Sequence, residues 1–317
     1  MSRIAHIYTG YRRLDGAARG NRGQGDRIRT LLEGSDLQTD GKFGTMRIVL
    51  TNDDGIEAPG LLAARRALEK VGDVITVAPD QNRSGVGRSI SFGRSLHVEE
   101  HEMADGVVGY ACSGTPVDCV RLVALGLMDF EPDVVVSGIN HGENLGDDIT
   151  YSGTVAGAME GIVIGVPGIA VSLSINRPWH ETVQESMPLE QGLHFEAAAD
   201  FTARLVKVAF KGLPPGRILN VNAPNLPREK LRGARVTRLG RRFYKDELVE
   251  VRDEEGRVGY DIYNNPPGHH EEEGTDFAAI ENDEISITPV HLELTDTSGL
   301  EELNAWDVKD LLENGLD

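Results

Sequence analysis

Short apolar runs alternate with longer helical stretches from Met46 onward, and this alternation limits the folds open to the chain more than any other feature. The first run ends in TNDDG, and the stretch after it starts at Pro59 and stops at Gly72, as helices commonly do. Strands that alternate with helices indicate a mostly parallel sheet with helices on both faces. We therefore predict an α/β fold of the doubly wound type. The predicted strands are 46–50, 74–78, 133–137, 169–173 and 218–221, and the predicted helices are 60–72, 116–127, 152–164 and 195–210.

The rest of the chain differs from this pattern. Residues 1–45 are rich in Arg, Gly and Asp without an apolar period, and we expect a poorly ordered extension ahead of a core at 46–234. Residues 235–290 alternate β-like runs with charges and include the hairpin-like RDEEGRVGYDIYNN. They hold too little apolar content for a separate domain, so we expect an extended β arm that packs on a neighbouring subunit. Residues 291–317 are predicted to form a C-terminal helix and tail. The elements expected in these segments are a strand at 284–290 and a helix at 300–315.

The charge balance excludes some partners. The chain has 51 acidic and 32 basic residues, a net charge of −19, and only seven lysines. Such a surface repels nucleic acid polymers and anionic membranes, so we expect neither as a partner. An acidic, lysine-poor composition is also typical of proteins from salt-loving archaea, and we expect a haloarchaeal source and a halophilic protein.

The sequence carries no sign of membrane insertion or secretion. No apolar run approaches the roughly 18–20 residues that span a bilayer, and the first residues lack the apolar stretch of a secretory signal. We therefore expect a cytoplasmic protein. Cys112 and Cys119 are neither spaced like a metal knuckle nor numerous enough for a disulfide scaffold. We interpret them as small, partly buried apolar residues.

Asp53 and Asp54 follow the first predicted strand directly. Carboxylates next to a buried strand are costly unless they are paired or bound to a metal. Hard divalent cations favour such oxygen ligands, so the pair is a candidate metal site. The alternative is an Asx-turn or a helix cap before Pro59, since Asp and Gly are common turn residues.

Ser84 lies in PDQNRSG, after the second predicted strand. The neighbouring Asn82, Arg83 and Gly85 offer donors and a close-approach backbone that suit an anion. The alternative is an ordinary polar loop, which is a common feature.

Asn140 stands in GINHGENLGDD, after the third predicted strand. Glycines at 138, 142 and 146 let backbone amides approach a phosphate, and Asn144 adds a side-chain donor. The chain has neither GK[ST] here nor GxGxxG after the first strand, which argues against a Walker loop and a dinucleotide fold. The alternative is a plain glycine-rich loop.

Ser152, Gly153 and Thr154 begin a predicted helix, where free amides and hydroxyls form a phosphate site. The alternative is ordinary capping by Ser152. A doubly wound topology brings these strand ends and this helix start into one crevice. Oxygen ligands next to anion donors indicate metal-assisted phosphoryl chemistry.

Five long motifs resemble the survival protein SurE family of 5′-nucleotidases. They are MRIVLTNDDGIEAPG, APDQNRSG, GTPVDCVRLVALGL, SGINHGENLGDDITYSGTVAGAMEG and GTDFAAIENDEISITPV. The resemblance runs from Met46 to about Val290, and residues 1–45 have no counterpart in it.

The resemblance implies a Rossmann-like core and one divalent cation, Mg²⁺ or Mn²⁺, per subunit. The family's ligands, two adjacent aspartates, a serine and an asparagine, fall on Asp53, Asp54, Ser84 and Asn140. Asn144, Ser152, Gly153 and Thr154 would then hold the phosphate. The resemblance also implies a C-terminal arm exchanged between the subunits of a homodimer or homotetramer.

The activity implied is hydrolysis of nucleoside 5′-monophosphates, with 3′-monophosphates and short polyphosphate as further substrates, by a metal-activated water. Asp53 or Asp54 would orient or deprotonate that water. Three alternatives stay open: a phosphatase in which Asp53 is a covalent nucleophile, a non-catalytic nucleotide-binding sensor, and an interaction protein that uses its arm alone. We assign no role to His141 or Glu143.

Overall fold

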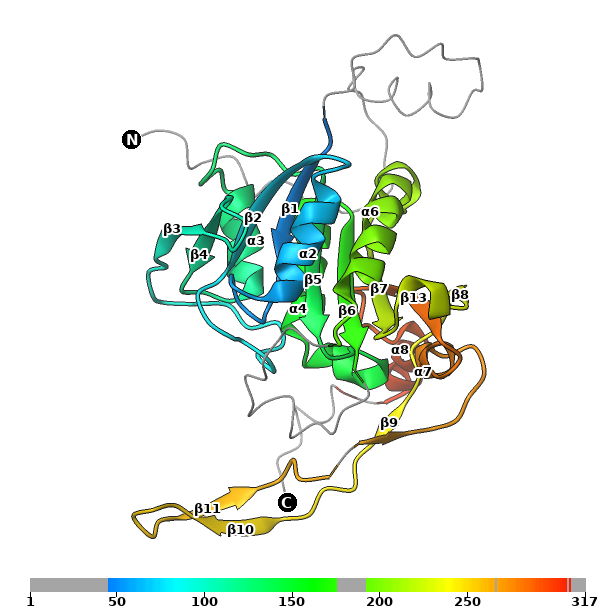
Figure 1. Cartoon of the computed structure of the whole chain (residues 1–317). Helices are drawn as coiled ribbons and strands as arrows, with labels where there is room; N and C mark the ends of the chain where they lie inside the picture. The colour runs from blue at the N-terminus through cyan, green and yellow to red at the C-terminus, as the bar shows by residue number, and fades with distance from the viewer. Residues whose placement is uncertain (1–44, 176–191, 266, 307, 309–317) are drawn as a thin grey trace, which may run out of the picture. The chain divides into compact units, whose positions relative to one another are not determined.

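The computed structural model describes residues 45–175, 192–265, 267–306 and 308 (Figure 1). The extension predicted at 1–45 therefore lies outside the described residues, apart from Thr45. A nine-stranded sheet with the order β3-β4-β2-β1-β5-β6-β7-β13-β8 forms the centre of the fold. Adjacent strands from β4 to β7 are parallel, which confirms the predicted α/β fold with a mostly parallel sheet.

All five predicted strands are present, and four of them extend further than their apolar runs. They are β1 (Arg47–Thr51), β2 (Asp73–Pro79), β5 (Val134–His141), β6 (Gly168–Ser174) and β7 (Arg217–Pro224). The chain starts near the middle of the sheet at β1, moves outward to β2, and returns to β5 on the other side of β1. This reversal is the switch point at which doubly wound sheets bind ligands, beyond the carboxyl ends of the strands.

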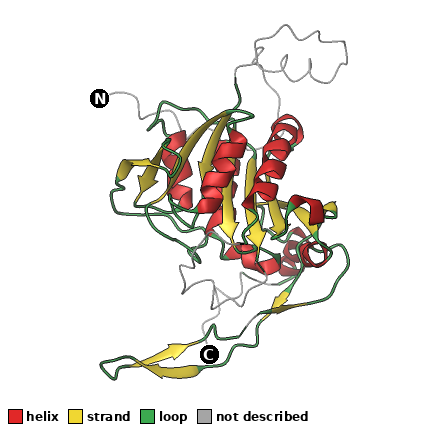
Figure 2. Ribbon diagram, in the orientation of Figure 1, coloured by secondary structure: helices red, strands yellow, loops and turns green. Residues whose placement is uncertain are grey.

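Helices cover both faces of the sheet (Figure 2). Ile48 and Leu50 of β1 pack in the cluster that lies under α2 (Pro59–Leu68) and α6 (Phe195–Gly212). The residue between them, Val49, packs on the opposite face against α3 (Pro116–Ala124). Successive side chains of a strand point to opposite faces, so a strand buried on both sides needs an unbroken apolar run such as IVL at 48–50. α4 (Gly153–Ile164) packs beside α3 on the second face. Among the described residues no helix is long and apolar enough to cross a membrane.

Two strands at one edge of the sheet were not predicted. β3 (Val98–Glu102) pairs antiparallel with β4 (Val108–Cys112), and β4 continues the sheet from β2. β3 has the sequence VEEHE and is largely exposed, so it lacks the apolar pattern by which a strand is recognised. Cys112, at the end of β4, and Cys119 are both buried and form no disulfide.

The C-terminal boundaries differ from those predicted. β13 (Glu284–His291) pairs with β7 and with β8 (Gly233–Val236), so both belong to the central sheet. The arm predicted at 235–290 therefore includes, at both of its ends, residues that belong to the central sheet. The last helix, α8 (Thr297–Asn304), begins earlier than the predicted 300–315, because the Asp296 side chain caps its first turn by accepting from the Ser298 amide (3.0 Å). Residues 307 and 309–315 of that prediction lie outside the described residues.

The described part of the arm forms two small sheets separate from the central one. β9 (Arg242–Phe243) pairs with β12 (Gly268–His269), and further along β10 (Val249–Arg252) pairs with β11 (Val258–Asp261). The second pair is the predicted hairpin, which turns through Gly256 at φ +78°. A short helix, α7 (Asp276–Glu281), then leads back to β13.

Candidate active site

The loop after β1 is shaped by Asn52 rather than by the aspartates. The Asn52 side chain donates to the Gly55 carbonyl (2.9 Å) and accepts from the Gly55 amide (3.2 Å). Gly55 has φ +108°, in the region that favours glycine. Since Asn52 makes the turn considered as an alternative role for Asp53 and Asp54, both carboxylates are left for other contacts.

Asp53 is buried, with 3% of its surface exposed, and lies at the N-terminus of α4. Its carboxylate accepts a hydrogen bond from the Thr154 hydroxyl. A Cβ on Gly153 would lie 2.8 Å from both Cβ and Oδ2 of Asp53, so only glycine permits this approach. Burial raises the pKa of Asp53, and the Thr154 hydroxyl and the amides of Gly153 and Thr154 act against that rise.

Asp54 lies against the end of β5. Its Oδ2 accepts from the His141 amide at 3.0 Å. Burial, followed by the charge of Asp53, raises the pKa of Asp54 from 3.8 to about 7, although the His141 amide opposes this. Among the described residues no lysine or arginine forms an ion pair with Asp53 or Asp54. Asp53 is buried and Asp54 is half-buried. Two adjacent carboxylates in such surroundings without a countercharge are unfavourable, and a bound cation would relieve the cost.

Ser84 lies in the loop that follows β2, and it is exposed. The Arg83 amide donates to the Asp53 carbonyl (2.6 Å), and the Ser84 amide donates to Asn82 Oδ1 (2.7 Å). The Arg83 guanidinium donates a hydrogen bond to the Ser113 carbonyl (3.0 Å). It therefore stabilises the loop instead of facing an anion. These contacts hold Ser84 beside the Asp53 backbone.

Asn140 is the next-to-last residue of β5. Its Nδ2 donates to the Gly142 carbonyl (2.9 Å), and this fixes the side-chain amide while leaving Oδ1 as an acceptor. The pairing of β5 with β6 shifts between Ser137 and Asn140. At Gly138 a Cβ would lie 2.1 Å from the Val171 carbonyl oxygen, so this shift requires glycine. Asn140 is thereby placed one residue from the His141 amide that binds Asp54.

The predicted phosphate-binding residues are held firmly by other protein groups. Asn144 is buried. Its side-chain Nδ2 donates to Ser172 Oγ (2.8 Å), and its backbone amide donates to Asn222 Oδ1 (2.8 Å). Ser152 caps α4 by accepting from the Val155 amide (3.0 Å), which is the alternative role considered for it. The Thr154 hydroxyl is taken by Asp53. The start of α4 is thus fixed beside the carboxylates.

Sequence reasoning did not assign two residues that position this site. Asn52 turns the loop, and Asn222 on β7 orders the segment around Asn144 by donating to its carbonyl (3.0 Å). An Asn-x-x-Gly spacing after a buried strand is the signal that could have identified Asn52. Nothing in the local sequence marks Asn222, because it meets Asn144 from 78 residues away.

The donor set suits a hard cation. Among the described residues no group of three or more His, Cys, Asp and Glu side chains is placed to hold a metal. The candidate set instead combines the carboxylates of Asp53 and Asp54 with the Ser84 hydroxyl and the Asn140 amide oxygen. Mg²⁺ and Mn²⁺ take oxygen ligands of these kinds, and Mg²⁺ commonly uses only one or two carboxylates.

The chain is similar to known proteins over most of its length. The family model described as Survival protein SurE matches residues 48–246. A protein named 5′-nucleotidase SurE from Rubrobacter xylanophilus is 76% identical over 264 residues, covering 83% of this chain and 98% of the relative. One of the same name from Chloroflexus aggregans is 48% identical, covering 83% of this chain and 99% of the relative. The crystal structure of the SurE protein from Aquifex aeolicus matches with a TM-score of 0.66 at 39% identity, covering 84% of this chain and 100% of that one.

These relatives do not support the expected haloarchaeal source, since Rubrobacter is a bacterium. An acidic, lysine-poor composition is therefore not sufficient to assign a source. The matched residues include both carboxylates, the Ser84 loop, the end of β5 and the start of α4. On the extent of these matches, the chain belongs to the survival protein SurE family.

Proposed function

We propose that this chain is a metal-dependent phosphatase that hydrolyses nucleoside 5′-monophosphates. The observation that carries the proposal is the pair of adjacent carboxylates, the buried Asp53 and the half-buried Asp54, placed between the end of β5 and the N-terminus of α4. The relatives named 5′-nucleotidase SurE share nearly their full length with the chain and support the same activity. Hydrolysis of 3′-monophosphates and short polyphosphate belongs to the proposal as a secondary activity.

One divalent cation, Mg²⁺ or Mn²⁺, would be held by Asp53, Asp54, Ser84 and Asn140. When bound, such a cation shields phosphate charge and lowers the pKa of the water that it activates. The chain's own contribution is to fix the ligands: Thr154 holds Asp53, and the His141 amide holds Asp54. With its Oδ2 on that amide, Asp54 has a second oxygen that can orient the attacking water.

The phosphate would lie at the start of α4, near Asn144, Ser152, Gly153 and Thr154. The amides in the first turn of a helix point out of its N-terminus and, with the helix dipole, favour an anion. The Thr154 hydroxyl and the amides of Gly153 and Thr154 are directed to Asp53, and the Val155 amide donates to Ser152 Oγ. The Ser152 hydroxyl hydrogen and the second N–H of the Asn144 side chain are therefore the donors left for phosphate oxygens.

The test is a panel of phosphate esters assayed with Mg²⁺, with Mn²⁺ and with a chelator. Nucleoside 5′-monophosphates should be hydrolysed fastest, and the chelator should abolish turnover. A phospho-aspartate trapped on Asp53 would contradict hydrolysis by an activated water. Nucleotide binding without turnover under any metal condition would favour the sensor alternative instead.

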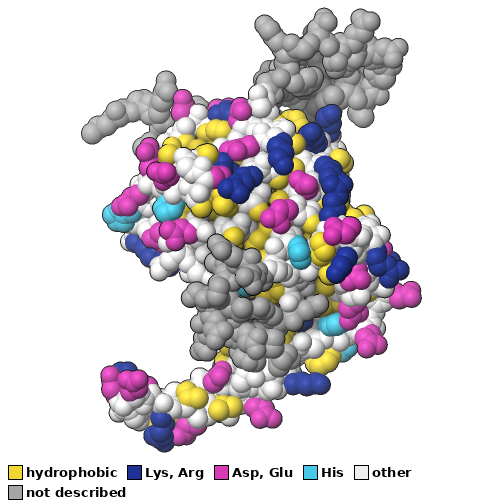
Figure 3. Space-filling view, in the orientation of Figure 1, with side chains coloured by type: hydrophobic (Ala, Val, Ile, Leu, Met, Phe, Trp, Pro, Cys, Tyr) yellow, Lys and Arg dark blue, Asp and Glu magenta, His cyan; other side chains and the backbone are white. Residues whose placement is uncertain are grey.

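The arm supports a proposal about assembly. Apolar side chains are exposed along the hairpin and beside it, as Figure 3 shows, with Leu248 72%, Tyr260 62% and Tyr263 60% exposed. A two-stranded hairpin alone is marginally stable in water. Burial of these side chains against a second subunit would stabilise it, so we propose a homodimer or homotetramer built by arm exchange. We also propose a cytoplasmic protein without nucleic acid or membrane partners.

A further inference from the structure

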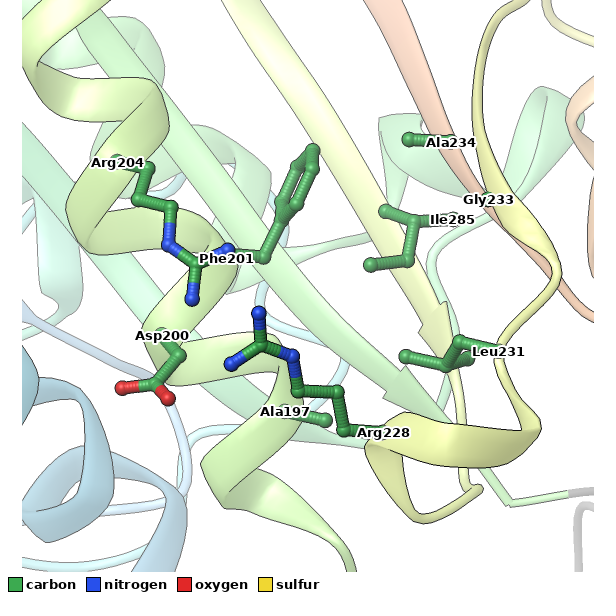
Figure 4. Close-up of a pocket in the computed structure, with 9 residues that line it drawn as sticks. All are labelled: Ala197, Asp200, Phe201, Arg204, Arg228, Leu231, Gly233, Ala234 and Ile285. Carbon is green, nitrogen blue, oxygen red and sulfur yellow. The ribbon is translucent and has the colours of Figure 1, made fainter.

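A cavity of about 280 Å³ lies on the described part of the chain, away from the residues of the candidate active site (Figure 4). It is bounded by α6, by the short helix η2 (Arg228–Lys230), and by β8 and β13 at the edge of the central sheet. The side chains that matter to its chemistry are Asp200, Phe201, Arg204, Arg228, Leu231 and Ile285.

Two arginines give this cavity its charge. Arg204 comes from α6 and Arg228 from η2, and both guanidinium groups project into the same space beside Phe201 (Figure 4). Within the described part of the chain, neither guanidinium has a hydrogen bond or an ion pair. By contrast, Arg235 on the neighbouring strand β8 pairs with Glu284 at 2.7 Å.

Asp200 does not neutralise the pair. Its carboxylate is directed to Lys70, whose Nζ lies 3.8 Å from Oδ1. The negative charge of Asp200 is therefore shared with a lysine, and the two guanidinium groups keep an unmatched positive charge. Both arginines are exposed, and an anion bound between them could accept hydrogen bonds from both guanidinium groups.

The rest of the lining is largely apolar. Phe201 and Leu231 are half-buried, and Ile285 is 3% exposed. A volume near 280 Å³ lies at the lower end of the range for small-molecule sites, enough for a ligand with about one ring. Arginine suits planar, bidentate contacts with carboxylate and phosphate oxygens.

We propose that this cavity binds a small organic anion, a phosphate monoester or a carboxylate with an apolar body of about one ring. Arg204 and Arg228 hold the anionic group, and Phe201 packs against the apolar part. The inference does not rest on the proposed phosphatase activity, because no residue of the cavity belongs to the candidate active site.

The test is calorimetric titration of the full chain with phenylphosphonate, phenylacetate, inorganic phosphate and the neutral benzamide. The double variant Arg204→Gln/Arg228→Gln should bind the two aromatic anions at least tenfold more weakly than the unmodified chain. Arg217→Gln, at an exposed arginine that begins β7 and does not line the cavity, is the control for the loss of a surface arginine and should bind normally. Any binding of these ligands at the candidate active site is the same in the unmodified chain and in the variants. It therefore does not contribute to the difference in affinity between them.

The two aromatic anions distinguish a phosphate ligand from a carboxylate ligand. Phe201→Ala should weaken both of them and leave inorganic phosphate unaffected. If the double variant does not fold, Arg204→Lys/Arg228→Lys keeps the charge without the bidentate geometry, and intermediate affinity is expected. Equal affinity in the double variant and the unmodified chain would overturn the proposal, as would equally tight binding of benzamide. A changed oligomeric state in the variant, with no anion binding by the unmodified chain, would assign the arginines to a subunit contact and overturn it too.

Discussion

Thr154, the second residue of α4, donates its hydroxyl hydrogen to Asp53, which follows β1 and lies 101 residues earlier in the chain. This contact fixes the start of a helix against the end of a strand. Gly153 allows it, since a Cβ there would press into the Asp53 side chain. The carboxylate and the helix N-terminus therefore keep a constant separation, as a site that joins a cation to a phosphate requires.

The first prediction concerns the carboxylates. Asp53→Asn or Asp54→Asn should lower kcat/KM by orders of magnitude with the fold intact, because the amide keeps the shape but loses the charge that a cation needs. Steady-state kinetics with circular dichroism would measure both effects. Asp73→Asn, at the exposed first residue of β2, is the control and should retain activity. Near-normal turnover by both variants at saturating metal would contradict the assigned roles.

A second prediction concerns the Thr154 hydroxyl. Thr154→Val should lower the free energy of unfolding by about 1.5–3 kcal/mol, because a hydrogen bond to a charged group is lost. Turnover should fall roughly 10–100-fold, since Asp53 is no longer held in place. Thr154→Ser keeps the hydroxyl and should behave nearly as the unmodified chain in urea unfolding and in kinetics. If serine and valine gave the same values, the hydroxyl would have no such role.

The third prediction is a pH dependence set by Asp54. Its pKa is raised in the folded chain from 3.8 to about 7, so the folded state binds this proton more tightly than the unfolded state does. The resulting stability is complete below about pH 4 and is lost as the pH rises through about 7. In the presence of a chelator, the melting temperature should therefore fall over this interval.

The matching control is Asp54→Asn, which removes the titrating group. Without divalent metal it should be more stable than the unmodified chain at pH 7–8 and should lose less stability between pH 4 and pH 7. Mg²⁺ or Mn²⁺ should stabilise the unmodified chain at neutral pH by binding the ionised carboxylates, and should do so much less for the variant. Parallel melting curves for the two proteins would show that Asp54 does not titrate in this range.

The sequence predicted the centre of the fold well because buried parallel strands need unbroken apolar runs, and IVL in β1 is such a run. β3 was not predicted because an exposed edge strand does not need an apolar run, and its sequence VEEHE is typical of a polar loop. β13 was recognised as a strand, but its antiparallel pairing with β7 depends on contacts between distant residues that no local pattern encodes. It was therefore placed in the arm instead of the sheet.

At the candidate site, the residue types and their positions at strand ends could be predicted, but their individual contacts could not. Asp53 and Asn52 are both plausible turn residues in sequence, and only the fold shows that Asn52 makes the turn. Similarly, Ser152 and Thr154 look alike at a helix start, yet one caps the helix and the other binds Asp53. These choices depend on which groups face each other across the sheet.

The last prediction concerns the arm, whose base is tied to the core. Arg242 of β9 donates through Nε to Asp148 (2.7 Å), and the Tyr244 hydroxyl binds the same carboxylate. Asp148 lies in the short helix η1 (Gly146–Thr150), between Asn144 and the start of α4. The arm is therefore connected to the segment that carries the proposed phosphate donors, so that the binding of the hairpin by a partner subunit is expected to affect turnover through this connection.

The hairpin can be removed without disturbing this base. Glu247 and Asn264 are joined by two hydrogen bonds (2.5 and 3.2 Å), so residues 248–262 can be replaced by two glycines. Light scattering should then show a smaller assembly than that of the unmodified chain, with reduced activity. Leu248→Ser/Tyr260→Ser/Tyr263→Ser keeps the chain length and should weaken assembly in the same direction, because it removes apolar surface that a partner would bury. A deletion variant that keeps both its assembly and its full activity would show that the subunits associate through another surface.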